Sequence, residues 1–279
     1  MPTTPHIARA ALHHWEEPVI SGRQGRGAVF FSGCALRCVF CQNHEISTDC
    51  FGEAVSVERL REIYAALIAQ GAHNINLVTA SHFAPWVVQS LSPALPVPVV
   101  WNCGGSESAE ILSMLAGKVQ VYLPDLKYAD NDLAAKLSAA PDYFEVATAA
   151  IEEMHRQVGD VVIEDGLLKR GVVIRHLVLP GQLDNTRRVL DWVMVLPGIV
   201  CCDASFSSEE PSSASNSAAS WLSVASSRPS AVLSNGRSNA AMKNTNTSVP
   251  IPMKSMRFAP GKCVSLKRVP RITMAAPHE

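Results

Sequence analysis

The sequence predicts an α/β protein built as a partial (β/α)6 barrel, in which parallel strands are covered by helices. Between residues 27 and 200, short apolar runs alternate with longer segments whose apolar residues recur at helical spacing. The short runs are apolar throughout, which is typical of parallel strands buried on both faces. Five such units can be counted, and Ile199-Val200 begins a sixth. The barrel is therefore expected to be incomplete at its last strand.

Five strands and four helices can be assigned individually within this region. The strands are Ala28–Phe31, Ile75–Thr79, Val97–Asn102, Val119–Leu126 and Val172–Leu179. The helices are Val57–Gln70, Ser106–Leu115, Asp142–Val158 and Asn185–Val195. The helix over Val57–Gln70 has the clearest pattern, because Leu60, Ile63 and Tyr64 recur at helical spacing and Ser56 is suited to cap its start.

The two ends of the chain are predicted to differ from residues 27–200. Residues 1–26 form an N-terminal extension, in which the segment from Leu12 is suited to a short helix that Pro18 stops. Residues 201–279 form a tail in which 15 of the first 50 residues are serine, a composition that cannot bury a core. Because the change falls within an expected strand, we expect that the residues from about 201 come from a shifted reading frame. The alternative is a natural, disordered serine-rich tail whose basic end contacts nucleic acid.

Composition limits the class of protein. The chain has 279 residues, of which 47% are hydrophobic, so a sizeable core can be buried. The net charge of −1 gives no indication of a nucleic-acid partner. No apolar run approaches the roughly 18 residues that span a membrane, and no signal peptide is recognisable. The eight cysteines are unevenly spaced, unlike a secreted disulfide framework, so a cytoplasmic location is expected.

Three cysteines form the most informative motif. Cys34, Cys38 and Cys41 lie within eight residues, on the loop that leaves the first predicted strand. Grouped thiolates suit zinc or an iron–sulfur cluster. A closed structural zinc site has four ligands, so a zinc knuckle would need Cys50 as its fourth. A four-iron cluster held by three thiolates would instead leave one iron open.

The spacing of these cysteines, with Phe40 directly before the last one, resembles the signature of the radical S-adenosylmethionine superfamily. In that family the three cysteines hold a [4Fe-4S] cluster, and S-adenosylmethionine chelates the fourth iron. Reductive cleavage of S-adenosylmethionine then releases a 5′-deoxyadenosyl radical that abstracts hydrogen from a substrate. The resemblance also implies a TIM-like barrel of the radical S-adenosylmethionine type.

Three longer stretches resemble the pyruvate formate-lyase activating enzyme group of this superfamily over about residues 8 to 200. They read FFSGCALRCVFCQN, YLPDLKY and IRHLVLPG, and the stretch HxWEEPxISG precedes the first. The resemblance implies that Lys127 and Arg175 contact S-adenosylmethionine, with Asp125 and Asn102 beside them. Residues suited to the adenine are Phe40 and Leu177. Thr79 begins the sequence that stands where the group has Gly-Gly-Glu, whose backbone meets the amine.

This resemblance predicts an enzyme that cleaves S-adenosylmethionine and activates a partner glycyl radical enzyme. A small-molecule substrate is the alternative to a protein glycine. Flavodoxin or ferredoxin is expected as the electron donor, because no second redox centre is recognisable. Neither a nucleic acid nor a membrane is expected as a partner. Two other functions stay open at this point: a zinc-stabilised binding module, and an electron carrier whose cluster does not bind S-adenosylmethionine.

Overall fold

The computed structural model describes residues 3–14, 16–196, 198–204 and 262–264, all of which belong to one compact unit. Ten strands form one sheet in the order β10-β9-β8-β6-β5-β4-β2-β1-β3, with β7 paired to β8. Their bounds are β1 His6–His13, β2 Arg26–Phe31, β3 Glu53–Ala54, β4 Ile75–Val78, β5 Val99–Cys103, β6 Val121–Pro124, β7 Val162–Glu164, β8 Leu167–Leu177, β9 Val200–Ala204 and β10 Lys262–Val264.

Six of these strands are parallel and lie side by side in chain order. They are β2, β4, β5, β6, β8 and β9. Since crossovers between parallel strands are right-handed, a sheet that always adds its next strand on the same side receives its helices on one face. This is the strand order of a partial six-stranded barrel, and the α/β prediction is confirmed. Over the described part of the chain the sheet is open, with β3 at one edge and β10 at the other.

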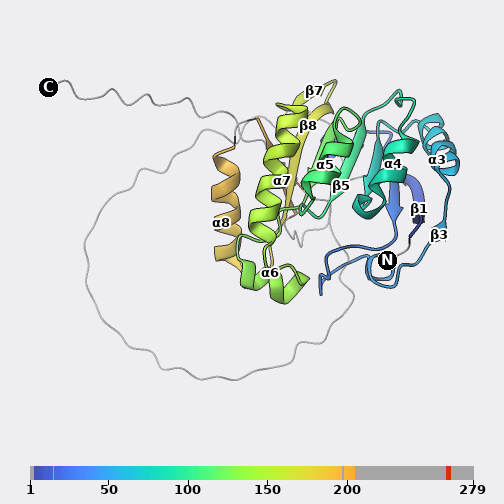
Figure 1. Cartoon of the computed structure of the whole chain (residues 1–279). Helices are drawn as coiled ribbons and strands as arrows, with labels where there is room; N and C mark the ends of the chain where they lie inside the picture. The colour runs from blue at the N-terminus through green and yellow to red at the C-terminus, as the bar shows by residue number, and fades with distance from the viewer. Residues whose placement is uncertain (1–2, 15, 197, 205–261, 265–279) are drawn as a thin grey trace, which may run out of the picture. The chain divides into compact units, whose positions relative to one another are not determined.

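One face of the sheet is covered by a layer of helices. The helices of the described residues are α1 Pro18–Ser21, α2 His44–Ser47, α3 Val57–Ala69, η1 Ser81–Phe83, α4 Ala84–Ser90, α5 Ala109–Leu115, α6 Asn131–Ser138, α7 Tyr143–Val158 and α8 Leu183–Met194. Helices α3, α4, α5 and α7 pack each against the next, and Figure 1 shows them in a row with α8. No helix among the described residues is both long and apolar enough to cross a membrane.

Successive side chains of a strand point to opposite faces of the sheet, so the buried side chains form two clusters, one on each face. Leu77, Trp101 and Tyr122 belong to the large cluster that also contains the apolar faces of α3, α5 and α7. The neighbouring residues Val100 and Val121 belong to a smaller cluster on the other face of the sheet. That cluster is completed by Ile20 of α1, Leu123, Leu168 and Val173. The N-terminal segment therefore covers part of the face that the helical layer leaves open.

The predictions for the first and last strands of the sheet need correction. The segment around Leu12 is not a helix: it belongs to β1, which pairs antiparallel with β2, and Pro18 begins α1 instead of ending a helix. Proline suits a first helical position because its missing N–H would have no partner there. Helices α4 and α6 are present in the structure but are not among the four helices predicted from the sequence.

The last parallel strand is not cut short at Val200. β9 pairs with β8 from Val173 opposite Val200 to Leu177 opposite Ala204. The strand continues for four residues beyond Val200, as far as Ala204, and so passes the point where the change in composition seemed to begin. Within the predicted disordered tail, Lys262–Val264 forms β10 and pairs antiparallel with β9. The rest of that tail, residues 205–261 and 265–279, lies outside the described residues.

Candidate functional site

Polar residues gather at the carboxyl ends of the parallel strands, the edge where ligands bind in such sheets. Asn102 lies in β5, Asp125 follows β6, and Arg175 lies near the end of β8. Asp125 and Arg175 form a parallel bridge, and the N–H of Leu126 donates to the Arg175 carbonyl at 2.8 Å. The ends of β6 and β8 are thereby held together, and their side chains share one face.

These side chains form one hydrogen-bonded network. Arg175 Nε donates to Asp125 Oδ1 at 2.8 Å, and Arg175 Nη2 donates to Asn102 Oδ1 at 2.7 Å. Lys127 Nζ forms an ion pair with the other carboxylate oxygen of Asp125. Side-chain exposure is 20% for Asp125, 14% for Lys127 and 25% for Arg175, so the charges are shielded but reachable. The structure thus brings these four residues together.

The network keeps both kinds of charge. Burial raises the pKa of the Asp125 carboxyl, but the positive charges of Arg175 and Lys127 outweigh burial, and the net pKa is lowered. Burial lowers the pKa of Arg175, but Asp125, Glu17 and Glu16 outweigh it, and the net pKa is raised. One carboxylate and two cations are therefore present at this edge, a combination suited to a ligand that carries both charges.

Glu17 is a member of this network that the sequence did not single out. Its Oε1 lies 3.5 Å from Arg175 Nη1, and its other oxygen pairs with Arg26, whose side chain is 2% exposed. Glu16 also pairs with Arg26. Glu17 itself has a left-handed backbone, with φ of 38°. The sequence did contain a signal for this residue. The two adjacent glutamates of HxWEEPxISG indicate that arginine or lysine side chains lie nearby.

Tyr143, the first residue of α7, fixes the two loops that carry the network. Its hydroxyl lies 2.8 Å from the carbonyl oxygens of Gly104 and Asp125, and it accepts from the Lys127 N–H at 3.1 Å. The loops approach so closely that a Cβ at Gly105 would lie 2.1 Å from the Asp125 carbonyl oxygen. Gly105 also has φ of 92°, which favours glycine. Both features hold the ends of β5 and β6 at a fixed spacing.

Thr79 borders the network through its backbone. Its N–H donates to the Asn102 carbonyl at 2.8 Å, and its φ of 58° is unusual for a β-branched residue. Two residues later, Ser81 Oγ donates to Glu107 Oε1 at 2.6 Å. Glu107 is 5% exposed, and burial raises its pKa. The turn after β4 is thus tied to the loop after β5.

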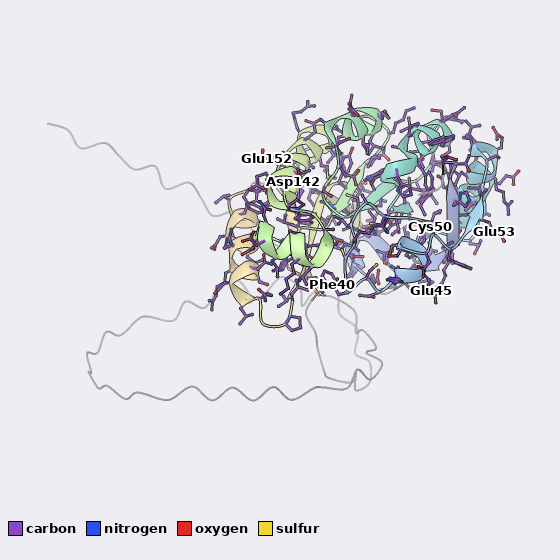
Figure 2. The ribbon with its side chains drawn as sticks, turned by 60° about the horizontal axis from the view of Figure 1, so that its bottom comes forward. Phe40, Glu45, Cys50, Glu53, Asp142 and Glu152 are labelled. Atoms are coloured by element: carbon purple, nitrogen blue, oxygen red, sulfur yellow. The ribbon has the colours of Figure 1, made fainter. Side chains whose placement is uncertain are left out.

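The cysteine loop lies beside this network and rests on the end of α6. The N–H of Arg37 donates to the Ser138 carbonyl at 3.0 Å, and the N–H of Val39 donates to the Leu137 carbonyl at 2.9 Å. These are terminal carbonyls that have no partner within the helix. Figure 2 turns this end of the molecule toward the viewer, with Phe40 at the loop.

The chemistry of the three thiols fits a soft metal or an iron–sulfur cluster. All three are half-buried and free. Burial raises the pKa of Cys34 and of Cys38; the other thiols of the loop add to this effect, and Lys127 opposes it. The sulfurs therefore lie within electrostatic reach of one another and of the network. Among the described residues, however, no three His, Cys, Asp or Glu side chains are gathered as a formed metal site.

Three other candidate residues make no contact that assigns them a role. Phe40 and Leu177 are half-buried and pack against the large core cluster. Their contact with an adenine stays a prediction. Cys50, the fourth ligand of the zinc alternative, has its sulfur 3.8 Å from the Thr48 carbonyl oxygen.

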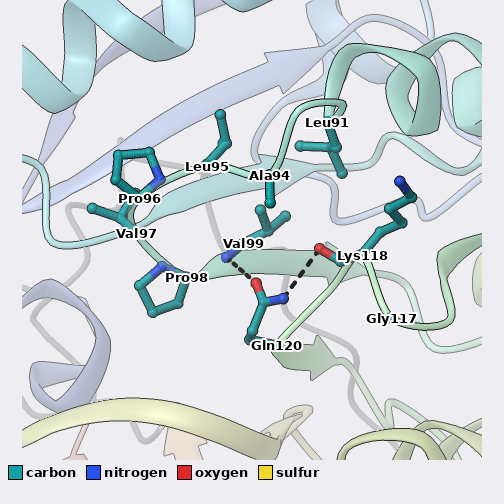
Figure 3. A pocket seen from close by; sticks show the side chains of 10 residues that line it. All are labelled: Leu91, Ala94, Leu95, Pro96, Val97, Pro98, Val99, Gly117, Lys118 and Gln120. Atoms are coloured by element: carbon teal, nitrogen blue, oxygen red, sulfur yellow. Dashed lines mark hydrogen bonds between the residues drawn. The ribbon is translucent and has the colours of Figure 1, made fainter.

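A cavity of ≈ 300 Å³ lies away from this site, where the chain enters β5 and β6 (Figure 3). The side chain of Gln120 closes part of its wall, since its Oε1 accepts from the Val99 N–H at 2.9 Å. Most of the lining is apolar, with Lys118 as the charged member. The cavity is at the amino ends of the strands, so it shares no residue with the polar network.

Comparisons with known proteins leave the family open. No family model matches the chain. The uncharacterised protein MJ0674 of Methanocaldococcus jannaschii is 30% identical over 193 residues, which cover 65% of this chain and 52% of that protein. The match thus spans about half of the relative's length. Among solved structures, Streptococcus suis SuiB is similar with a TM-score of 0.39 and 12% identity, over 58% of this chain and 35% of SuiB. A TM-score this low carries no argument about function.

Proposed function

We propose that this protein is a radical S-adenosylmethionine enzyme of the pyruvate formate-lyase activating type. The observation that carries the proposal is the meeting of two groups of residues at one edge of the sheet. Cys34 and Cys38 of the C-x3-C-x2-C loop lie within electrostatic reach of Lys127, which is itself paired with Asp125 and, through it, with Arg175. Neither group alone would distinguish this function from metal binding.

Each residue of the site has a role in the proposal. Cys34, Cys38 and Cys41 would hold a [4Fe-4S] cluster, which would supply the one electron that cleaves S-adenosylmethionine to methionine and a 5′-deoxyadenosyl radical. Lys127 and Arg175 bind the carboxylate of S-adenosylmethionine, because a guanidinium can bind a carboxylate through two parallel hydrogen bonds. Such a carboxylate would bind beside Arg175 Nη1, whose contact with Glu17 Oε1 is long at 3.5 Å.

The remaining residues orient the ligand. Asp125 accepts from the amine, and its lowered pKa keeps it ionised at neutral pH. Asn102 holds the guanidinium of Arg175 from the opposite side. The backbone of Thr79 faces the same edge, and Phe40 and Leu177 contact the adenine. An external donor, flavodoxin or ferredoxin, reduces the cluster, and the substrate is a glycine of a partner enzyme.

The test is anaerobic reconstitution with iron and sulfide, followed by dithionite and S-adenosylmethionine. We expect a brown protein with a broad absorption shoulder and the release of 5′-deoxyadenosine. Cys38→Ala should lose both, whereas Cys50→Ala, the matched control, should keep both. A colourless protein that holds one zinc ion and loses it in Cys50→Ala would reject the proposal in favour of a zinc-stabilised module.

A further inference from the structure

A buried pair of hydroxyl groups leads to the middle cysteine of the loop. Ser138, the last residue of α6, donates from Oγ to Cys38 Sγ at 2.9 Å. The hydroxyl of Tyr128 lies 2.6 Å from the same Ser138 Oγ. Both Ser138 and Tyr128 are 0% exposed. Water therefore does not compete for these hydrogen bonds, and the sulfur is held against a donor that is 100 positions away in the sequence.

The direction of the two protons follows from the chemistry of hydroxyl groups. A serine hydroxyl carries one proton, and Ser138 uses it to donate a hydrogen bond to the sulfur of Cys38. The 2.6 Å contact must then be a donation from Tyr128 to Ser138. A hydroxyl that accepts one hydrogen bond is a stronger donor in the next, so the pair is cooperative. Tyr128 is fixed by the ring of Tyr143, which lies edge-on at a centroid distance of 5.3 Å.

The backbone of the loop makes this contact part of the fold. The hydrogen bonds from Arg37 and Val39 to the terminal carbonyls of α6 stand on either side of Cys38. These two hydrogen bonds fix the distance between the backbone of Cys38 and the end of α6. Cys41 differs, because its sulfur lies 3.2 Å from Ser47 Oγ, where either atom can be the donor. Of these two sulfurs, only that of Cys38 has a donor whose direction is set by a second hydroxyl.

We infer that Tyr128 and Ser138 act as positioning residues that tune the reduction potential of a cluster bound through Cys38. This inference rests on the proposed cluster. A hydrogen bond to a ligand sulfur withdraws electron density from the metal and stabilises the reduced state, so it raises the potential. The relay therefore makes the cluster easier to reduce than it would be in a purely apolar setting.

The experiment measures the midpoint potential of the reconstituted full-length protein by redox titration followed by electron paramagnetic resonance. In Ser138→Ala we expect a shift to more negative potential at unchanged iron and sulfide content. Tyr128→Phe should shift it in the same direction by less, because Ser138 still donates. Ser90→Ala is the matched control, because Ser90 is a buried serine whose hydroxyl contacts that of Tyr64 at 3.1 Å and the Val87 carbonyl instead of a cysteine, and it should leave the potential within error of the wild type.

The outcomes separate this inference from the proposed function. A Ser138→Ala protein with a full cluster and the wild-type potential would overturn the relay alone. A shifted potential in a protein that does not respond to S-adenosylmethionine would support the relay and overturn the proposed function. A wild-type protein that assembles no cluster would overturn both. If Ser138→Ala does not fold, Tyr128→Phe decides, because it leaves the cysteine loop and its helix-end hydrogen bonds unchanged.

Discussion

The strand-end network and the cysteine loop are adjacent but are held in different ways. Asn102, Asp125 and Arg175 lie in or directly after parallel strands, and the sheet's own hydrogen bonds set their spacing. The loop of Cys34 to Cys41 has no strand partner over these residues and rests on two carbonyls of α6. The network is accordingly a formed set of contacts, whereas the thiols are near one another without a formed metal site among the described residues.

This difference indicates that the two regions are suited to different tasks. Strand ends are suited to orient a ligand whose charges must be met at fixed distances. A loop that rests on a helix end is suited to adjust around a metal cluster, because coordination supplies its own geometry.

The largest effect on stability is expected from Gly105→Ala, a substitution in the loop that packs against Asp125 of the network. The left-handed backbone costs about 1–2 kcal/mol for a residue with a Cβ. The contact of 2.1 Å with the Asp125 carbonyl oxygen adds to this, for a total on the order of 3 kcal/mol in unfolding free energy. Gly117→Ala is the control, since Gly117 has φ of 72° but no atom within 4 Å of the added Cβ. Urea denaturation of both variants measures the difference, and equal losses would show that the loops are not in close contact.

A smaller effect is expected from Tyr143→Phe, which removes one hydroxyl and no packing. The variant loses the contacts with Gly104, Asp125 and the Lys127 N–H, which costs about 1–2 kcal/mol. S-adenosylmethionine should also bind more weakly, as measured by calorimetry. Tyr122→Phe is matched to it, because that hydroxyl contacts Gln157 at 2.6 Å and lies away from the site. A similar loss of affinity in both variants would contradict a specific role for Tyr143.

The smallest effect is a pH dependence that originates in Asp125. Its pKa is lowered in the folded protein, so its contribution to stability is present above the ordinary aspartate pKa of about 3.9 and is lost as the pH falls through the lowered value. The stability advantage of the wild type over Asp125→Asn should therefore shrink as the pH falls below about 4. An advantage that grows as the medium becomes more acidic would mean that the carboxyl is not held in its ionised form.

Periodicity and motif spacing were sufficient to predict the parallel sheet and the residues at its strand ends. Lys127 and Arg175 could be assigned because each directly follows or ends an apolar run. Glu17 could not, since it is 158 positions from its partner Arg175 and the predicted helix before Pro18 is a strand. Ser138 is likewise 100 positions from Cys38. Which side chains meet across a sheet depends on how the segments pack, and one sequence gives no measure of that.

The last parallel strand shows a second limit. Val200–Ala204 forms β9 although the composition changes directly afterwards, because strand formation depends on a few residues and on an available neighbour. Composition averaged over a long tail cannot place such a boundary. The same averaging concealed β10, which consists of three residues.

The central claim is that the thiol loop and the strand-end network act together on one ligand. The most direct test is the electron paramagnetic resonance spectrum of the reduced, reconstituted protein before and after addition of S-adenosylmethionine. We expect S-adenosylmethionine to change the spectrum in the wild type, and the change to need a higher ligand concentration in Arg175→Lys. A cluster whose spectrum is indifferent to saturating S-adenosylmethionine would contradict the claim.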